Sequence, residues 1–168
     1  MKPTLYKKYN YFIDERGAFY EMLKKKKYSF ETVFTALSIS KKNVIRGFHC
    51  QAKKKQKILL IVLKGRILDV CVDVRKNSKN FGKVYKNYMR QGDALFIPKD
   101  FLHGFAAYGA ENMLLYHFSN YWDKKSEIGV SWNDATLNVD WKIRKPILSN
   151  KDKNNQSFQN FLQEHKAE

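Results

Sequence analysis

The chain has 168 residues, 43% of them hydrophobic and 15% aromatic, which suits one domain with a substantial core. No apolar run of about 18 residues occurs, which argues against a membrane span, and the N-terminal residues lack an apolar signal core, which argues against secretion. The formal net charge of +16, from 32 basic and 16 acidic residues, suggests an anionic partner.

The basic residues lie in short clusters within expected turns and not along one helix face. The lysine clusters are residues 24–27, 41–42, 53–55 and 124–125. No zinc-finger, homeodomain or RNP-type motif accompanies them, so a solvated basic surface is favoured over a specific nucleic-acid site. Attraction of a diphosphate-bearing small molecule is a third use of this charge. Cys50 and Cys71 lack metal-type spacing, and we expect a reducing, cytoplasmic location.

Short apolar stretches alternate with turn residues along most of the chain. We expect strands at residues 1–13, 18–23, 37–40, 44–51, 57–63, 67–75, 83–89, 94–97, 104–107 and 113–118. Residues 98–101 predict a turn. Around residues 30–34 the pattern is ambiguous, since Ser29 and Thr32 suit a short capped helical turn and residues 32–35 also suit a strand.

Two strands have patterns that place them inside the fold. Residues 57–63 form a continuous apolar run, which is typical of a strand buried on both faces. Residues 67–75, ILDVCVDVR, alternate in type. One face of this strand carries Leu68, Val70, Val72 and Val74, and the other carries Asp69, Cys71, Asp73 and Arg75.

The C-terminal part of the chain has few strand signals. Residues 121–141 are irregular, residues 147–152 predict a loop, and residues 155–165 predict a helix with three apolar residues on one face. The whole pattern predicts an all-β sandwich or barrel of the jelly-roll kind with a short C-terminal helix, as a single domain over residues 1–168.

Two histidine-bearing stretches predict a small-molecule site inside this barrel. The first is residues 44–51, VIRGFHCQ, and the second is residues 98–103, PKDFLH. Gly92, Pro98 and His103 have the spacing of the second motif of a cupin barrel. In the first motif the second histidine position is Gln51, so His49 and His103 alone do not supply the three or four ligands that a metal needs. We therefore expect no metal.

A barrel histidine without a metal is free for proton transfer. Imidazole ionises near pH 6.5, so His49 is a candidate general base if a carboxylate orients it and an acid faces it across the substrate. A hydrogen-bonded structural histidine is the alternative. Arg46 suits an anion, or else a surface ion pair. His117 lies next to Tyr116 and should point to the other face of the strand, in a structural role.

Eight segments, in order, resemble the 3,5-epimerases of nucleotide-linked 4-keto sugars, the family typified by dTDP-4-dehydrorhamnose 3,5-epimerase. The segments are DERGAFYE (14–21), KKNVIRGFHCQ (41–51), GRILDVCVDVRKNSKNFGK (65–83), IPKDFLHGF (97–105), LLYHFSNYW (114–122), SEIGVSWND (126–134), VDW (139–141) and LSNKD (148–152). The resemblance implies a cupin-type homodimer that uses no metal and no coenzyme, and whose substrate is a nucleotide sugar.

The resemblance also implies roles for individual residues. His49 would be the general base, Asp152 would orient it, and Tyr116 would return a proton to the opposite face. Contacts with the substrate or its diphosphate would fall on Arg16, Glu21, Arg46, Gln51, Lys57, His103, Glu127 and Lys151, and Trp122 would stack on the nucleotide base. The chemistry is consistent, because a 4-keto group acidifies the hydrogens on C3 and C5 and an enolate needs a stabilised oxyanion.

Two segments depart from the family pattern. Phe34, Thr35 and Ala36 stand where Gln-Asp-Asn is usual, and Gln56-Lys57-Ile58 stands where Gln-Gly-Lys is usual, so the family's lysine is missing or displaced to Lys57. The pocket has therefore lost polar contacts. A dTDP-4-keto-6-deoxyhexose and a GDP-4-keto-heptose are both open as substrates, with C3, C5 or both inverted, in surface polysaccharide (capsule or lipopolysaccharide) biosynthesis.

Two other functions are compatible with the same barrel. A non-catalytic sugar-nucleotide or nucleic-acid binder would not need His49, Tyr116 and Asp152 together, which argues against it. A sister ketoisomerase would move the carbonyl and invert no centre, and NMR of the product separates it from an epimerase. The expected partners are a nucleotide-sugar substrate and a second copy of the chain, with no specific nucleic acid and no membrane.

Overall fold

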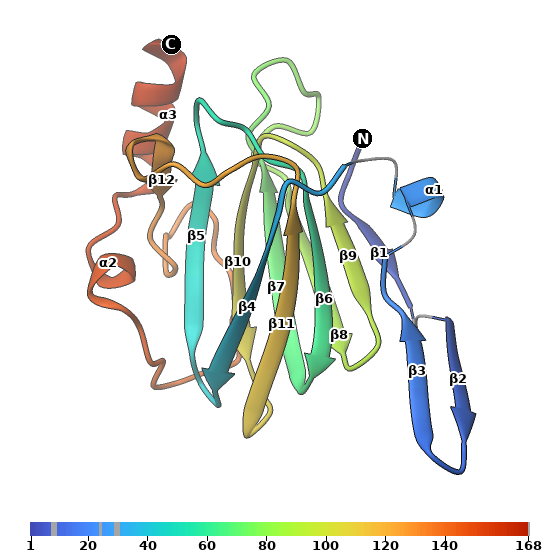
Figure 1. The fold of residues 1–168 in the computed structure, drawn as a ribbon. Helices are drawn as coiled ribbons and strands as arrows, with labels where there is room; N and C mark the ends of the chain where they lie inside the picture. Colours follow the sequence, from blue (N-terminus) through green and yellow to red (C-terminus); the bar gives the residue numbers. More distant parts are fainter. Residues whose placement is uncertain (8–9, 24, 29–30, 168) are drawn as a thin grey trace.

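A computed structural model describes residues 1–7, 10–23, 25–28 and 31–167 (Figure 1). The strands are β1 (Thr4–Tyr6), β2 (Asn10–Asp14), β3 (Gly17–Glu21), β4 (Phe34–Lys41), β5 (Ile45–Gln51), β6 (Ile58–Lys64), β7 (Arg66–Asp73), β8 (Val84–Arg90), β9 (Ala94–Ile97), β10 (Phe101–Ala107), β11 (Glu111–Phe118) and β12 (Glu127–Gly129). The helices are α1 (Lys25–Tyr28), the 3₁₀ helix η1 (Lys124–Ser126), α2 (Asn150–Lys153) and α3 (Phe158–Ala167).

Two sheets face each other and form the barrel. Within the described residues, one five-stranded sheet has the order β1-β9-β6-β11-β4 and the other has the order β12-β5-β10-β7-β8. The strand pairs of both sheets are antiparallel. The expected all-β, cupin-type jelly roll with a C-terminal helix is confirmed. The hairpin β2–β3 projects away from the barrel (Figure 1).

The apolar side chains of β7 divide between two parts of the core. Leu68, Val70 and Val72 pack outward against a cluster that includes Phe158 and Phe161 of α3, whereas Cys71 packs between the sheets. Both faces of β7 are therefore buried, and the acidic face that the sequence displays is turned into the barrel. The prediction that residues 57–63 form a strand buried on both faces is confirmed. This strand is β6, and its residues 59–62 are fully buried.

Several predicted boundaries are wrong. Of the two alternatives left open around residues 30–35, the strand is correct for Phe34 and Thr35, which begin β4, and a helical turn reaching Phe34 is excluded, while Ser29 and Phe30 lie outside the described residues. The expected turn at residues 98–101 ends earlier, because Phe101 already pairs with Asp73 and begins β10. Residues 24–27 were expected only to end a strand, but residues 25–28 form α1, and Tyr28 packs edge-on against Tyr6 at 5.1 Å.

The C-terminal region is more ordered than the sequence suggests. The helix α3 begins three residues later than expected, at Phe158. Residues 150–153 form α2 where a loop was expected, and residues 127–129 pair with β5 as β12 within a stretch expected to be irregular. Among the described residues, no helix is long and apolar enough to cross a membrane.

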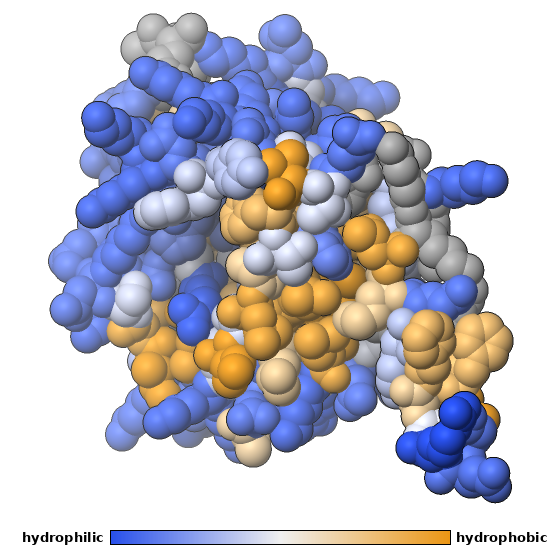
Figure 2. All heavy atoms as spheres, in the orientation of Figure 1, coloured by the Kyte–Doolittle hydropathy of each residue, from blue (hydrophilic) through white to orange (hydrophobic). Residues whose placement is uncertain are grey.

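Exposed apolar side chains gather on the outer face of β4 and on the projecting hairpin (Figure 2). On β4, Leu37 and Ile39 are 50% and 55% exposed. On the hairpin, Phe12, Ile13 and Phe19 are each more than 60% exposed, at 63%, 70% and 68%. Side chains of this size are costly to leave in water, so this face is suited to contact with another protein surface.

Candidate active site

A cavity of about 180 Å³ opens between the two sheets, near the point where β5 ends and β6 begins. Its lining residues come from both sheets and from the loops between strands: His49, Cys50, Gln51, Gln56, Ile58, Ile97, Pro98, Asp100, Phe101, His103, Tyr116, Phe118, Trp122 and Glu127. The two histidine-bearing stretches of the sequence therefore meet here, and His49 and His103 are register partners in the β5–β10 pair.

Close contact between two glycines sets how β5 and β10 approach each other. Gly47 has a φ of +120°, which L side chains rarely adopt, and a Cβ on it would lie 2.5 Å from the Cα of Gly104. The register of the pair shifts between His103 and Phe105, next to this contact. The glycine of VIRGFHCQ thus lets the backbones approach at the point where the two histidines enter the cavity.

His49 is paired with Asp152 of α2. Its Nε2 lies 2.7 Å from Oδ1 of Asp152, whose carboxyl is almost fully buried. Burial alone would raise the pKa of Asp152, but hydrogen bonds from His49, from the Ser149 hydroxyl and from the Gly47 amide, with the charge of His49, hold it below its ordinary value. Asp152 is therefore an anion near neutral pH and accepts the Nε2 proton, which leaves the lone pair on Nδ1.

Ser149 is a residue of the site that sequence reasoning missed. It caps α2, because its hydroxyl accepts from the Asp152 amide at 3.0 Å and donates to Asp152 Oδ2 at 2.9 Å. The signal was present as Ser-x-x-Asp in LSNKD, a capping-box pattern. Four helical residues without an apolar period were too few to reveal the helix that presents Asp152.

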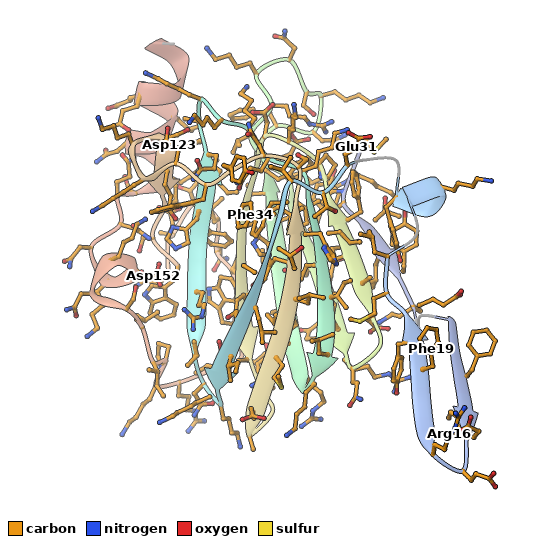
Figure 3. The ribbon with its side chains drawn as sticks, viewed as in Figure 1. Arg16, Phe19, Glu31, Phe34, Asp123 and Asp152 are labelled. Carbon is orange, nitrogen blue, oxygen red and sulfur yellow. The ribbon has the colours of Figure 1, made fainter. Side chains whose placement is uncertain are left out.

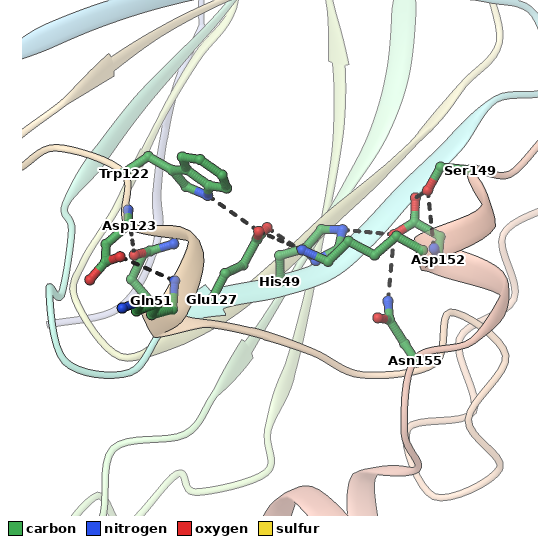
Figure 4. Close-up of polar contacts among 10 residues, drawn as sticks. His49, Gln51, Trp122, Asp123, Glu127, Ser149, Asp152 and Asn155 are labelled. Atoms are coloured by element: carbon green, nitrogen blue, oxygen red, sulfur yellow. Dashed lines mark hydrogen bonds and ion pairs between the residues drawn. The ribbon is translucent and has the colours of Figure 1, made fainter.

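A second carboxylate, Glu127, lies at the other nitrogen of His49 (Figure 4). Its Oε1 is 3.5 Å from Nδ1, and its Oε2 accepts from Trp122 Nε1 at 3.2 Å and from Lys151 Nζ. Nδ1 of His49 is buried and makes no hydrogen bond with the described residues. His49 is thus held between Asp152 and Glu127.

His103 forms a second histidine–aspartate pair inside the barrel. Its Nε2 lies 2.5 Å from Oδ2 of Asp69, which is fully buried. The Cys71 thiol donates to Asp69 at 3.3 Å. Burial, and to a smaller extent the Asp69 charge, raises the pKa of the Cys71 thiol well above its usual value. Asp69 was missed as a site residue. The alternation of ILDVCVDVR shows which face of the strand carries Asp69, but not that this face contacts His103.

Tyr116 reaches the cavity from β11, in the sheet opposite His49. Burial, with the Asp69 charge second, raises the pKa of Tyr116 well above its ordinary value, while Arg46 acts in the opposite direction. The phenol therefore keeps its proton at neutral pH. Its ring stacks on Phe118 with centroids 5.7 Å apart and meets the His103 ring edge-on at 6.5 Å. His117 points to the other face of β11, where its Nδ1 meets the Thr35 hydroxyl at 3.0 Å.

Aromatic rings occupy the region where the family has a polar segment. Phe34 stacks on Phe118 at 4.5 Å and on Tyr121 at 6.0 Å, with ring planes within 10° in both pairs. At the other departure, Ile58 lines the cavity and Lys57 does not. The Lys57 amide donates to the Ser119 hydroxyl at 2.8 Å. Ile58 and Phe118 therefore give this wall of the cavity an apolar surface, with Phe34 stacked behind Phe118.

The predicted binding residues fall into two groups. Gln51, His103, Trp122 and Glu127 line the cavity, and Lys151 touches it through Glu127. Arg46 does not line it, and donates instead to the Ser40 hydroxyl at 3.1 Å. Arg16 and Glu21 lie on the hairpin, with Arg16 near its far end, paired with Asp14 at 2.6 Å (Figure 3). The structure does not bring Arg16, Glu21, Arg46 or Lys57 into the cavity of their own chain.

His49 lies between two carboxylates, and His103 is bound to one. Across the described residues, no group of three or more His, Cys, Asp or Glu side chains has an arrangement that could hold a metal ion. What the arrangement does offer is a histidine–carboxylate pair on one wall and a protonated tyrosine on the facing wall. That pairing suits proton transfer to and from opposite faces of one small molecule.

Known proteins resemble this chain along most of its length. The family described as dTDP-4-dehydrorhamnose 3,5-epimerase matches residues 2–160. The dTDP-4-dehydrorhamnose 3,5-epimerase of Shigella flexneri is 37% identical over 156 residues, covering 88% of this chain and 86% of the relative. The enzyme of the same name from Methanothermobacter thermautotrophicus is 34% identical, covering 85% and 83%.

Solved structures agree with the sequence matches. The Legionella pneumophila epimerase RmlC, in complex with dTDP-4-keto-L-rhamnose, superposes with a TM-score of 0.89 at 29% identity, covering 97% of this chain and 96% of that one. The dTDP-4-dehydrorhamnose 3,5-epimerase of Elizabethkingia anophelis superposes with a TM-score of 0.84 at 34% identity, covering 95% and 98%.

Proposed function

Since the chain belongs to the dTDP-4-dehydrorhamnose 3,5-epimerase family and is an isomerase, we propose that it inverts C3, C5 or both of a nucleotide-linked 4-keto sugar. The observation that carries this proposal is the placement of His49, bound to Asp152, and of Tyr116 on opposite walls of one cavity. Inversion requires a proton to leave one face of the sugar and return to the other, and these walls supply a base and an acid.

The reaction follows from the state of each group. Neutral His49 donates from Nε2 to Asp152 and takes the proton of C3 or C5 at Nδ1, giving an imidazolium and an enolate. Tyr116, held in its protonated form, then gives its proton to the opposite face of the same carbon. The imidazolium and the phenolate return to their starting states by exchange with solvent.

The enolate oxygen needs a positive or hydrogen-bonding neighbour. His103 lines the cavity, and Asp69 binds its Nε2. Nδ1 of His103 can donate to the enolate oxygen only when the ring carries a proton on both nitrogens, a state that the Asp69 carboxylate favours. A donor aimed at a developing oxyanion in a site shielded from water is the largest contribution in many reactions of this kind. We assign this role to His103, with Asp69 as the residue that orients it.

The proposed substrate is a dTDP-4-keto-6-deoxyhexose that supplies an activated deoxysugar for surface polysaccharide. The names of the relatives support the dTDP-linked sugar. The apolar part of the lining, which includes Ile58, Ile97 and Pro98, suits the C6 methyl group of a deoxyhexose, and it offers no hydrogen bond to a hydroxyl group placed against it. The position of Trp122 at the cavity, where its side chain is 54% exposed, supports the proposal that it stacks on the nucleobase.

We also propose that the protein acts as a homodimer. The exposed apolar residues of β4 and of the hairpin form a surface suited to a second copy of the chain. Arg16 and Glu21 do not reach the cavity of their own chain, and a partner in contact with this face would receive them. In that arrangement Arg16 would meet the substrate's diphosphate of the neighbouring subunit.

Incubation with candidate sugar nucleotides in deuterium oxide tests the function. With dTDP-4-keto-6-deoxyglucose we expect deuterium at C3, C5 or both, counted by mass and placed by NMR, together with an inverted product. A GDP-linked 4-keto-heptose should react more slowly. A product with a moved carbonyl would identify a ketoisomerase, and tight binding without exchange would identify a non-catalytic binder.

A further inference from the structure

The nitrogen of His49 that must act as the base is covered in the structure. Nδ1 is buried and has no hydrogen-bond partner among the described residues, although the His49 side chain as a whole is 27% exposed. The Glu127 carboxylate lies beside this nitrogen, with its Oε1 3.5 Å from Nδ1. A reacting carbon must come within about 3.5 Å of the base along its lone pair, so it cannot approach Nδ1 past a buried surface.

Glu127 is held in this position by its second oxygen. Oε2 accepts from Trp122 at 3.2 Å and forms an ion pair with Lys151 (Figure 4). Lys151 belongs to α2, next to Asp152, and its side chain is 51% exposed, whereas that of Glu127 is 15% exposed. The lysine is therefore reachable by a soluble anion, while the carboxylate beneath it is largely buried.

An anion that takes Lys151 weakens the hold on Glu127. A half-exposed ion pair is screened by water and is weak, and a diphosphate offers a denser charge and more acceptor oxygens than one carboxylate. Once Lys151 turns toward the diphosphate, Glu127 loses this ion pair, and its contacts with Trp122 and His49 alone hold it over Nδ1.

We propose that Glu127 and Lys151 form a latch on the base: Glu127 covers Nδ1 of His49 until a diphosphate draws Lys151 away. Glu127 is here a positioning residue and not a catalytic one. With this latch, Nδ1 of His49 becomes accessible to the sugar only when the diphosphate of the substrate has bound. This inference rests on the proposed role of His49 and adds to it a reason for the base to remain covered before the substrate binds.

Chemical modification of His49 measures whether Nδ1 is covered. Diethyl pyrocarbonate carbethoxylates an accessible, unprotonated imidazole nitrogen, and peptide mass mapping of the full chain gives the rate at each histidine. We expect slow modification of His49 in the wild type and a several-fold faster rate in Glu127→Ala. Inorganic pyrophosphate or dTDP, in a buffer without phosphate, should accelerate modification of His49 in the wild type, which is opposite to the usual protection by a ligand.

Variants of Lys151 separate the latch from general effects of charge. In Lys151→Met, His49 should react faster without ligand and should no longer respond to pyrophosphate. Lys153→Met removes an exposed lysine from the same helix and should behave as the wild type. His117, which does not line the cavity, serves as the internal reference in each sample.

Two results would overturn the latch. One is a wild-type rate at His49 that already equals that of Glu127→Ala, and the other is pyrophosphate that slows or leaves unchanged the modification of wild-type His49. The readout is carbethoxylation and not turnover. Failure of the proposed function would show instead as absent deuterium exchange with every sugar nucleotide, so the two failures are distinguishable.

Discussion

Tyr116 is the side chain whose role one substitution can decide. In Tyr116→Phe, His49 and Asp152 are intact, so proton removal should continue, but the enolate lacks a donor on the far side. We expect deuterium exchange to persist while inversion falls by about 10²–10⁴-fold, the usual loss for a general acid. Exchange and inversion are measured together by NMR in deuterium oxide.

Tyr121→Phe is the matched control for this prediction. Tyr121 lies five residues along the chain, is 63% exposed and does not line the cavity, so both rates should stay as in the wild type. If inversion were unchanged in Tyr116→Phe, the phenol would be a core aromatic of β11 and the acid would have to be sought elsewhere.

The buried carboxyl of Asp152 predicts how stability depends on pH. Its pKa in the folded protein is below the ordinary value of about 3.9, so its ionised form contributes stability above that value, and the contribution is lost as pH falls through the folded pKa. The free energy of unfolding of the wild type should therefore exceed that of Asp152→Asn at neutral pH, and the gap should close in acid.

Urea unfolding followed at several pH values measures this gap. Asp140→Asn is the control, because Asp140 also has a lowered pKa, from its contact with Lys142, but is exposed to solvent and should change stability little. A gap for Asp152 that widened in acid would mean that burial, and not the bond to His49, dominates its ionisation.

At the level of single residues, the sequence pointed to both members of the His49–Asp152 pair but to only one member of the His103–Asp69 pair. His49 and His103 stand out through motif spacing, and Asp152 through family resemblance. Asp69 could not be identified, because nothing in ILDVCVDVR distinguishes a buried carboxylate that binds a histidine from one at the surface. Glu127 was expected as a substrate contact, and its position at Nδ1 of His49 depends on a strand, β12, that has no sequence signal of its own.

Among the secondary-structure elements, the contact between β5 and β10 is the most sensitive to substitution. Gly47→Ala should destabilise the protein by more than the ~1–3 kcal/mol of an unfavourable φ alone, because the new methyl group would overlap the backbone of Gly104. Gly17 is the control, with a similar φ of +128° and no atom within 4 Å of the place that an added methyl group would take.

Thermal unfolding of Gly47→Ala and Gly17→Ala separates the two costs. Gly17→Ala measures the destabilisation caused by an unfavourable φ alone. Gly47→Ala adds the destabilisation caused by overlap of the new methyl group with the Gly104 backbone. Equal midpoints in the two variants would show that β5 and β10 can move apart, and the glycine contact would then not explain how the histidines are placed.

Elements with a regular period were predictable and short ones were not. The apolar run of β6 and the alternation of β7 give both strands to within two residues at each end. The helices α1 and α2 have four residues each, too few for an amphipathic period, and α1 lies in a lysine cluster that was expected only as a turn. The start of β10 depends on the pairing of Phe101 with Asp73 of β7, which is distant in the sequence and so cannot be predicted from a local pattern.

On the scale of the whole molecule, the net charge of +16 predicts weak, unspecific attraction to polynucleotides. Binding that comes from scattered lysines should fall steeply with salt, with a slope near −0.9 per phosphate neutralised. Fluorescence anisotropy with a labelled duplex, read from about 50 to 200 mM salt, measures it. Nanomolar, sequence-selective binding that survives physiological salt would instead favour the binder hypothesis.

The barrel as a whole followed from the sequence because regularly spaced strands with turn residues between them permit few architectures. The separate position of the β2–β3 hairpin and the apolar face of β4 did not follow. From sequence alone, large apolar side chains such as Phe12, Phe19 and Ile39 would be assigned to the core. Only the three-dimensional arrangement shows that they are exposed in the single chain.

Solvent exchange in His49→Asn tests the central claim most directly. Asparagine leaves a polar side chain of moderate size but has no basic nitrogen, and one base must start every inversion. We predict that deuterium incorporation into dTDP-4-keto-6-deoxyglucose, clear in the wild type, falls by at least about 10²–10⁴-fold at every carbon, with an unchanged circular dichroism spectrum. Near-normal exchange in a folded His49→Asn protein would contradict the mechanism proposed for this site.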